Sequence, residues 1–198
     1  MPPDHPGNRP ESRQSVIALA GRRVDHPAAK VSRFPLARLD EVREEIRRTL
    51  HTSLAGILVT AAACGADLLA LEVARQLGLR RRVVLPTTPD IFKATSVVDR
   101  PGAWESLFDR LIPEVEADGD LFICRHGNGG ESTDYFQTNL DILDEAARLA
   151  TESGMDMQAV VVWDGISRGA DDVTAHFLAE ARRRSIPITE ILTIPHSA

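Results

Sequence analysis

The chain contains 198 residues, of which 43% are hydrophobic and 26% charged, a composition that is typical of a globular protein and excludes collagen, coiled coils and global disorder. Asp and Glu number 29 against 23 Lys and Arg, and the resulting net charge of −6 argues against nucleic acid as a partner. No apolar run reaches the length of a membrane span, so we expect a cytoplasmic protein that does not bind membranes.

The start of the chain differs in composition from the rest. The first 14 residues are polar and contain four prolines, so we expect a disordered tail over 1–14 and one domain over 15–198. The two cysteines, Cys64 and Cys124, lie in separate hydrophobic segments, and the six histidines have no paired spacing. This pattern predicts buried, reduced thiols, no metal site and no required cofactor.

Short apolar, β-branched segments alternate with segments of helical periodicity, as in a parallel sheet wrapped by helices. The predicted strands are residues 16–20, 57–61, 82–85, 121–124, 159–163 and 188–193. Apolar stripes predict helices over 36–50, 69–77, 104–112, 136–150 and 173–181, and Pro113 should end or kink the third. We therefore predict an α/β fold: a single doubly wound Rossmann-like domain with a mainly parallel six-stranded sheet, strand order 3-2-1-4-5-6, and helices on both faces.

Ligands of such sheets bind beyond the carboxyl ends of the strands, so the loops that follow the strands are the first places to look for a site. After the first strand, Gly21 permits a tight exit and Arg22 and Arg23 follow it. Arginine holds phosphate through paired hydrogen bonds. Phosphate contact by one of the two arginines and pairing of both with surface acids are both open.

The loop after the second strand runs directly into a helix and contains Cys64, Gly65, Ala66 and Asp67. Small residues let a ligand approach the backbone, and the free amides at a helix start favour an anion. We therefore place a ligand contact here. The alternative is that Asp67 simply caps the helix.

Two further loops carry candidates. Pro86 follows the third strand and precedes a long connection over 87–102 that contains Phe92 and Ser96. Structureless connections of this length are uncommon and often functional, so this segment either covers a ligand or packs as a surface loop. Asn139 lies one turn into the helix that follows the Gly-rich segment 125–132. We include Pro86, Ser96 and Asn139 among the predicted ligand contacts.

The segment after the fifth strand is the densest run of turn, cap and polar residues in the chain. Its candidate ligand contacts are Asp164, Gly165, Ser167, Arg168, Gly169, Asp172 and Thr174. Two glycines beside a helix start can cradle a phosphate or a ribose, and Asp164 or Asp172 can accept hydrogen bonds from ribose hydroxyls. A plain strand-to-helix connection would need fewer polar residues, which favours a ligand site.

Several common motifs are missing from the sequence. It contains no G-x-G-x-x-G dinucleotide fingerprint, no G-x-x-x-x-G-K-[ST] phosphate loop and no G-x-S-x-G elbow. Ordinary dehydrogenases, P-loop NTPases and serine hydrolases of the α/β class are therefore disfavoured.

Taken together, the loop motifs resemble the SLOG superfamily, the Rossmann-like group that joins the Smf/DprA and LOG proteins. The matching blocks are residues 20–25 (AGRRVD), 33–35 (RFP), 62–70 (AACGADLLA), 85–86, Phe92 with 96–97, and 163–165 with Gly169 and Thr174. The resemblance covers nearly all of residues 16–194. It implies a likeness to bacterial SLOG domains of signalling and conflict systems, which are thought to sense nucleotide-derived ligands such as relatives of ADP-ribose.

The sequence departs from the enzymes of this superfamily. LOG-type phosphoribohydrolases carry P-G-G-x-G-T-x-x-E with a catalytic glutamate, whereas residues 165–177 read GISRGADDVTAHF. Nucleoside deoxyribosyltransferases are similar in outline and use acidic residues near this loop, which leaves Asp164 and Asp172 as weak catalytic candidates. Glu131 and Asp171 are further guesses for the carboxylate that such an enzyme needs at the sugar.

Two hypotheses follow. The first is a sensor that binds a small-molecule nucleotide derivative, such as ADP-ribose or NAD, at the carboxyl edge of the sheet and forms a homo-oligomer or signals to a separate effector protein. In it, amides near Gly65, Ala66, Gly169 and Ala170 hold phosphates, and Arg22 or Arg23 neutralises them. The second is a hydrolase or transferase acting on the N-glycosidic bond of nucleotides.

Overall fold

The computed structural model describes residues 13–124 and 132–195 of the chain. The predicted disordered tail falls mostly on residues 1–12, which lie outside the described residues, as does the guessed catalytic Glu131. None of the helices within the described ranges combines the length and hydrophobicity needed to cross a membrane.

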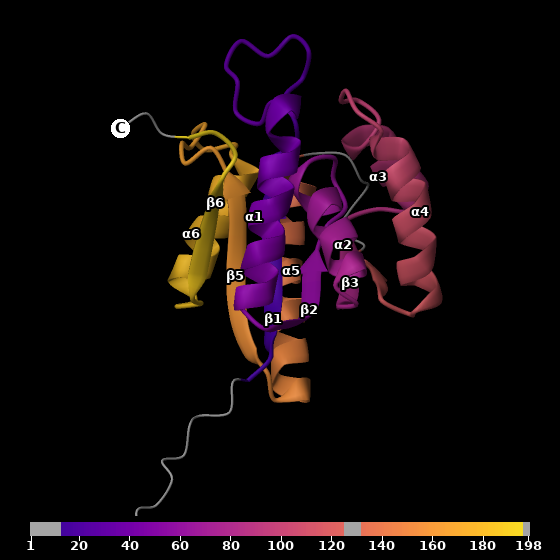
Figure 1. The fold of residues 1–198 in the computed structure, drawn as a ribbon, viewed down its shortest axis with the longest axis vertical. Coiled ribbons are helices and arrows are strands. Elements are labelled where there is room, and N and C mark those ends of the chain that lie inside the picture. The colour runs from indigo at the N-terminus through magenta and orange to yellow at the C-terminus, as the bar shows by residue number, and fades with distance from the viewer. Residues whose placement is uncertain (1–12, 125–131, 196–198) are drawn as a thin grey trace, which may run out of the picture.

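A single parallel sheet forms the centre of the molecule (Figure 1). Its strands are β1 (Ser15–Gly21), β2 (Ala55–Thr60), β3 (Arg80–Leu85), β4 (Leu121–Ile123), β5 (Asp156–Trp163) and β6 (Ile188–Leu192). Every adjacent pair is parallel, for example Ile17 opposite Leu58 of β2 and Gln158 of β5. All six predicted strands are therefore confirmed, with ends that differ by at most three residues.

Helices cover both faces of the sheet. They are α1 (Leu39–Thr52), preceded by a 3-10 turn η1 (Leu36–Arg38), α2 (Ala66–Gln76), α3 (Pro89–Ser96), α4 (Trp104–Ala117), α5 (Ser132–Ser153) and α6 (Val173–Arg183). One hydrophobic cluster joins the sheet to α1, α2 and α4, and a second joins its other face to α5 and α6. The predicted α/β doubly wound fold is thus confirmed.

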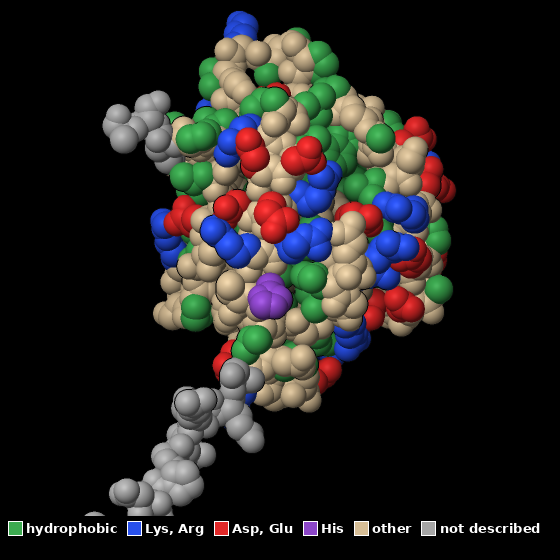
Figure 2. Space-filling model, viewed as in Figure 1, with side chains coloured by type: hydrophobic (Ala, Val, Ile, Leu, Met, Phe, Trp, Pro, Cys, Tyr) green, Lys and Arg blue, Asp and Glu red, His purple; other side chains and the backbone are tan. Residues whose placement is uncertain are grey.

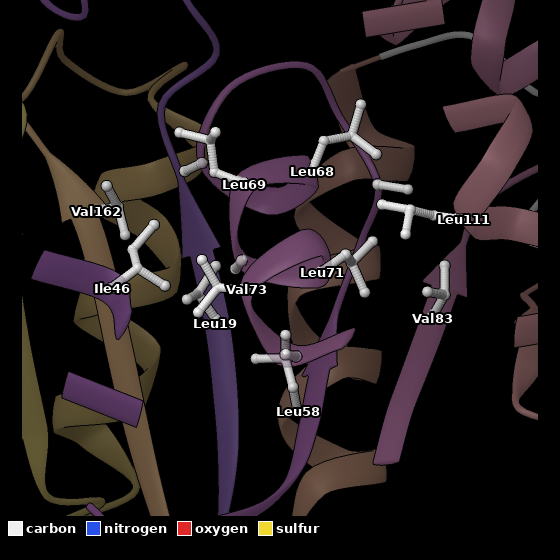
Figure 3. Close-up of a cluster of buried hydrophobic side chains, with 14 of the residues drawn as sticks. Leu19, Ile46, Leu58, Leu68, Leu69, Leu71, Val73, Val83, Leu111 and Val162 are labelled. Carbon is white, nitrogen blue, oxygen red and sulfur yellow. The ribbon is translucent and has the colours of Figure 1, made fainter. Parts of the chain in front are cut away.

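The alternation of side chains along the strands explains why the predicted strands are apolar throughout. In β1, Ile17 and Leu19 enter the cluster under α1 and α2, whereas Val16 and Ala18 enter the cluster under α5 and α6. Figure 3 shows Leu19 beside α2 in the first cluster. Full burial of each of the larger side chains, Val16, Ile17 and Leu19, contributes about 1.5–3 kcal/mol to folding.

The outward face of α1 carries the charges that its sequence period predicts. Exposed ion pairs one turn apart join Arg43 to Asp40 and Arg48 to Glu45. Figure 2 shows acidic and basic side chains interspersed over this face of the molecule. Exposed pairs of this kind each stabilise a protein by about 0–1 kcal/mol, so the buried face of α1 holds it in place.

The predicted strand order is wrong. The observed order is β4-β3-β2-β1-β5-β6, because β4 pairs with the outer edge of β3, with Val83 opposite Leu121. The apolar stripe of α4 packs with α2 on the face that α1 also covers, so the chain changes face only after β4, through α5. The order reverses between β1 and β5.

Two smaller expectations also need correction. The segment 87–102 is not structureless, since α3 occupies Pro89–Ser96 and buries Phe92. Of the two outcomes expected at Pro113, an end or a kink of the helix, the end is wrong, since α4 continues to Ala117. Proline removes one helical hydrogen bond, but the buried Ile112 and Val115 anchor the last turn on the core.

Candidate functional site

The reversal of strand order creates a crevice beyond the carboxyl ends of β1 and β5, the position where open α/β sheets bind ligands. These ends lie at the top in Figure 1, below the loop that follows β1. A pocket of about 420 Å³ lies there. Its walls come from the segments after β1, β2 and β5, from α3 and the residues just after it, and from the first half of α5.

Eight of the predicted ligand contacts line this pocket, and nine do not. The eight are Gly21, Arg22, Arg23, Asp67, Ser96, Asn139, Arg168 and Thr174. The nine, all of them described, are Cys64, Gly65, Ala66, Pro86, Asp164, Gly165, Ser167, Gly169 and Asp172. The loops singled out by the sequence thus surround this pocket, but the sequence did not distinguish the residues that line it from those that lie behind the lining.

Arg22 is the buried hub of the site. Its side chain is only 3% exposed, and its Nε donates to Asp164 Oδ1 over 2.9 Å. Its Nη2 donates to Asp172 Oδ2 and to the Ile166 carbonyl oxygen, both over 2.8 Å, and its guanidinium lies 5.8 Å from the Trp163 ring centre. Arg22 thus ties the end of β1 to the loop after β5.

These contacts set the charge states of the hub. Burial disfavours the Arg22 charge, but the hydrogen bonds to Asp172 and Asp164 raise the pKa of Arg22 above its ordinary value. Burial likewise opposes ionisation of Asp172, yet Arg22 and the backbone amides of Arg168 and Ala175 lower the pKa of Asp172 to about 2. Asp172 is therefore a permanent anion at neutral pH.

Asp172 also caps α6. Its side chain accepts from the amides of Thr174 and Ala175, over 3.1 Å each, and from the Arg168 amide over 2.8 Å. The Gly169 amide donates to Ser167 Oγ over 3.1 Å. The amides at the start of α6 are thus occupied by protein groups, and the carboxylates Asp164 and Asp172 act in the support of the loop.

Two glycines bring the start of α2 against the end of β1. A Cβ on Gly21 would lie 2.3 Å from the Ala66 Cβ, and one on Gly65 would lie 2.6 Å from the Arg22 carbonyl oxygen. Gly65 is the N-cap of α2 with φ of +104°, and the Ala66 amide donates to the Arg22 carbonyl over 3.1 Å. The alternative that Asp67 caps this helix is wrong, and the Ala66 amide binds protein.

Asp67 instead turns into the pocket. It is 6% exposed, its Oδ2 accepts from the Ala63 amide over 3.3 Å, and its Oδ1 has no hydrogen-bond partner among the described residues. Burial raises the pKa of Asp67 to about 7, against the opposing effects of the Ala63 and Gly21 amides and the Arg23 charge. A buried, titratable carboxyl in a pocket is a typical feature of a functional site.

The pocket lining is rich in arginine in a chain of negative net charge, and each of its arginines is paired with Asp99, Asp164 or Asp172. Its lining includes Arg22, Arg23, Arg33, Arg100 and Arg168, against the carboxyls of Asp25 and Asp67. Asp99, after α3, pairs with Arg23 and, over 3.0 Å, with Nη1 of Arg100. Arg100 Nε is buried without a partner among the described residues, and the Arg168 side chain is half-exposed.

Aromatic and neutral polar groups complete the walls. Phe92 and Ser96 come from α3, and Tyr135 comes from α5, with its hydroxyl 2.8 Å from Ser96 Oγ. Asn139 is positioned by donating from Nδ2 to the Val173 carbonyl over 2.7 Å. The pocket therefore combines aromatic surface for a flat group with guanidinium groups for an anion.

Sequence reasoning missed several lining residues. Arg100, Tyr135 and Thr138 are separated by 35 or more positions from the loops after β1 and β2, and no motif marks them. Only one weak signal pointed to Arg100: it is a charged residue within the connection 87–102, which is longer than a plain crossover requires. Tyr135 and Thr138 lie in the first two turns of α5, on the side of the helix that lines the pocket.

The two thiols do not add chemistry to the pocket. Cys64 and Cys124 are both free and buried, and burial raises the pKa of Cys64 and that of Cys124, the latter to about 12. Arg23 Nε donates to Cys64 Sγ over 3.4 Å. Among the described residues, no group of three or more His, Cys, Asp or Glu side chains is placed to hold a metal ion.

The fold and the pocket define the class: an α/β protein of Rossmann-like topology with an arginine-lined pocket at the point where strand order reverses. No family model and no curated protein matches the chain.

Two solved structures are distantly similar to it. DNA processing protein A (DprA) from Streptococcus pneumoniae is 18% identical with a TM-score of 0.41, covering 90% of this chain and 59% of that one. The molybdenum cofactor carrier protein MCP from Chlamydomonas reinhardtii is 14% identical with a TM-score of 0.38, covering 89% of this chain and 90% of that one. The chain thus spans about three-fifths of the DprA chain, and membership of the SLOG superfamily stays a prediction.

Proposed function

We propose that the protein is a sensor that binds a nucleotide-derived ligand, of the ADP-ribose or NAD type, in the pocket at the carboxyl edge of the sheet. The observation that carries this proposal is the pocket itself: about 420 Å³, lined by five arginines, two aromatic side chains and one unpartnered carboxyl. Its volume is in the range typical of small-molecule sites.

The arginines would bind the phosphates. Arg22 is fully engaged by Asp164 and Asp172, so this role falls to Arg23, Arg100 and Arg168, of which the first two share a single carboxylate. A phosphate accepts paired hydrogen bonds from guanidinium groups and would offer a partner to the buried Arg100 Nε. We therefore propose Arg23 rather than Arg22 as the phosphate contact.

The aromatic wall would hold the base. Phe92 and Tyr135 line the pocket from α3 and α5, and flat bases stack favourably on such rings. In the proposed role the protein needs no cofactor. It would transmit ligand binding through a homo-oligomer or to a separate effector protein, within a cytoplasmic signalling or defence pathway.

One observation favours the second candidate function, an N-glycosidic hydrolase or transferase acting on nucleotides. A carboxyl that titrates near neutral pH inside a pocket is suited to proton transfer, and Asp67 has this property. The earlier candidates are less suited, because Asp164 and Asp172 are held by Arg22 outside the pocket lining.

The test is a thermal-shift and calorimetric titration with ADP-ribose, NAD and AMP. At about one hundred times its dissociation constant a ligand adds about 2.7 kcal/mol of stability, which raises Tm by about 5–10 °C in a domain of this size. The double variant Arg23→Met, Arg168→Met should lose this shift. The control variant Arg183→Met, at an exposed end of α6, should retain it.

Analysis of the recovered ligand separates the two functions. Intact ligand supports the sensor, whereas free base together with the sugar phosphate identifies the enzyme. If none of the three compounds raises Tm, the nucleotide site is refuted while the fold assignment stands.

A further inference from the structure

Asp67 differs from the other carboxyl that lines the pocket. Asp25 has both oxygens bound, one by Ser32 Oγ over 2.8 Å and both by the Arg33 amide over 3.0–3.1 Å. Asp67 is more deeply buried, at 6% exposed, yet its Oδ1 has no partner among the described residues. A buried polar atom without a partner costs about 1–3 kcal/mol and calls for an explanation, such as a missing ligand.

The groups around Asp67 suit a side chain that accepts hydrogen bonds. The Ala63 amide donates to Oδ2, and the Gly21 amide and the Arg23 charge also favour the ionised form. Burial alone opposes ionisation, and it raises the pKa of the group to about 7. A donor placed at Oδ1 would add to these favourable interactions and shift the balance toward the ionised form.

We propose that Asp67 is the recognition residue of the pocket: its Oδ1 accepts a hydrogen bond from an N–H or O–H group of the nucleotide-derived ligand, and its carboxyl is ionised in the complex. This inference rests on the proposed function and adds the chemistry by which the ligand is selected. The donor is either an exocyclic amino group of the base or a hydroxyl of the ribose.

Ligand binding then releases a proton. About half of the Asp67 carboxyls are protonated at pH 7 in the free protein, so binding at pH 7 should release about half a proton per ligand, falling toward zero by about pH 9. The other charged or titratable groups facing the pocket are Arg22, Arg23, Asp25, His26, Arg33, Arg100, Tyr135 and Arg168. Only the part of the proton release that Asp67→Asn abolishes is assigned to Asp67.

The substitution Asp67→Asn has a further, specific consequence. In the variant, the side-chain oxygen should take the place of Oδ2, because the backbone N–H of Ala63 needs an acceptor there. The side-chain NH₂ group then takes the place of Oδ1. The pocket thus presents a donor where it presented an acceptor. The preference between ligands that differ only in donor and acceptor at this position should reverse.

The experiment is calorimetric titration with AMP, IMP and 2′-deoxy-AMP, in two buffers of different ionisation enthalpy, for the wild type, Asp67→Asn and the control Asp90→Asn. Asp90 is exposed in the first turn of α3. If the donor is the base amino group, the wild type should bind AMP at least about tenfold more tightly than IMP, and Asp67→Asn should prefer IMP. If it is the ribose hydroxyl, AMP and IMP should bind alike and 2′-deoxy-AMP about tenfold more weakly. Because a hydroxyl also accepts hydrogen bonds, the readout of Asp67→Asn in this case is the loss of proton release.

Either pattern, with proton release that Asp67→Asn abolishes and Asp90→Asn retains, supports the proposal. Nucleotide binding by the wild type with equal affinities for the three compounds, or with the same proton release in Asp67→Asn, overturns the assignment of Asp67 alone. A failure of all three nucleotides to bind refutes the proposed function, and the recognition role of Asp67 with it.

Discussion

The buried carboxyl of Asp67 should make the stability of the protein fall as the pH rises toward neutrality. Its pKa is raised from 3.8 in the unfolded chain to about 7 in the native state, so the native state binds more protons between these two values. Stability contributed by the protonated group is fully present below pH 3.8 and is lost as the pH rises through about 7. This direction is opposite to that of an ion-paired carboxylate.

The size of the effect follows from the shift. Each pH unit between the two pKa values changes the free energy of unfolding by about 1.4 kcal/mol, so the loss between about pH 5 and about pH 8 is about 2.5 kcal/mol. The assay is urea denaturation of the wild type and Asp67→Asn at both pH values. The difference in unfolding free energy between the two proteins should shift by about 2.5 kcal/mol in favour of the variant at the higher pH.

The control is Asp90→Asn, which removes an exposed carboxyl and should show no such shift between the two pH values. Because other groups titrate equally in all three proteins, the double difference isolates Asp67. A difference between wild type and Asp67→Asn that stays constant with pH, or shifts in favour of the wild type at the higher pH, would show that Asp67 is an ordinary ionised carboxylate.

Three further predictions concern the support of the pocket. Replacing Arg22 with Met should lower the unfolding free energy by about 3–5 kcal/mol in urea denaturation, because the buried carboxylates of Asp164 and Asp172 lose the counter-ion they share and keep only the more exposed Arg33 and Arg168. The control Arg183→Met should cost less than about 1 kcal/mol, and similar losses in the two variants would contradict the central role of Arg22. Gly65→Ala should lower the unfolding free energy by about 1–3 kcal/mol more than Gly78→Ala in the same assay. Both glycines have positive φ, but only at Gly65 would the added Cβ collide with backbone atoms, and equal losses would refute this reasoning. Asp99→Asn should tighten ADP-ribose binding several-fold in calorimetry, because Arg23 then has no competing carboxylate from Asp99. Weaker binding by the variant would show instead that Asp99 helps to hold the ligand.

The fold could be predicted from the sequence because each strand is apolar on both faces and each helix carries one apolar stripe. The strand order could not, since it depends on the face on which α4 packs, and an apolar stripe fits either face. The buried contacts of α4 with α2 decide it, and such contacts join residues far apart in the chain. Helix α3 was missed because a helix of eight residues gives too short a period.

The candidate site was predictable at the level of loops and not of side chains. Arg22 and Arg23 are neighbours in sequence and both line the pocket, but Arg22 is buried against two carboxylates 142 and 150 positions away, whereas Arg23 pairs with Asp99. The role of Asp67 depends on the packing of α2 on β1, which the glycine at position 65 permits. Local sequence carries none of this tertiary information.

The central claim is that the crevice between β1 and β5 is a nucleotide site. The most direct measurement is two-dimensional amide NMR of the protein titrated with ADP-ribose. The largest shifts should fall on the segment after β1, at Asp67, and around Asn139 and Thr174, which line the pocket together. Shifts confined to the groove near Arg47 and Arg110 on the helical face, or no shifts at saturating ligand, would contradict the account.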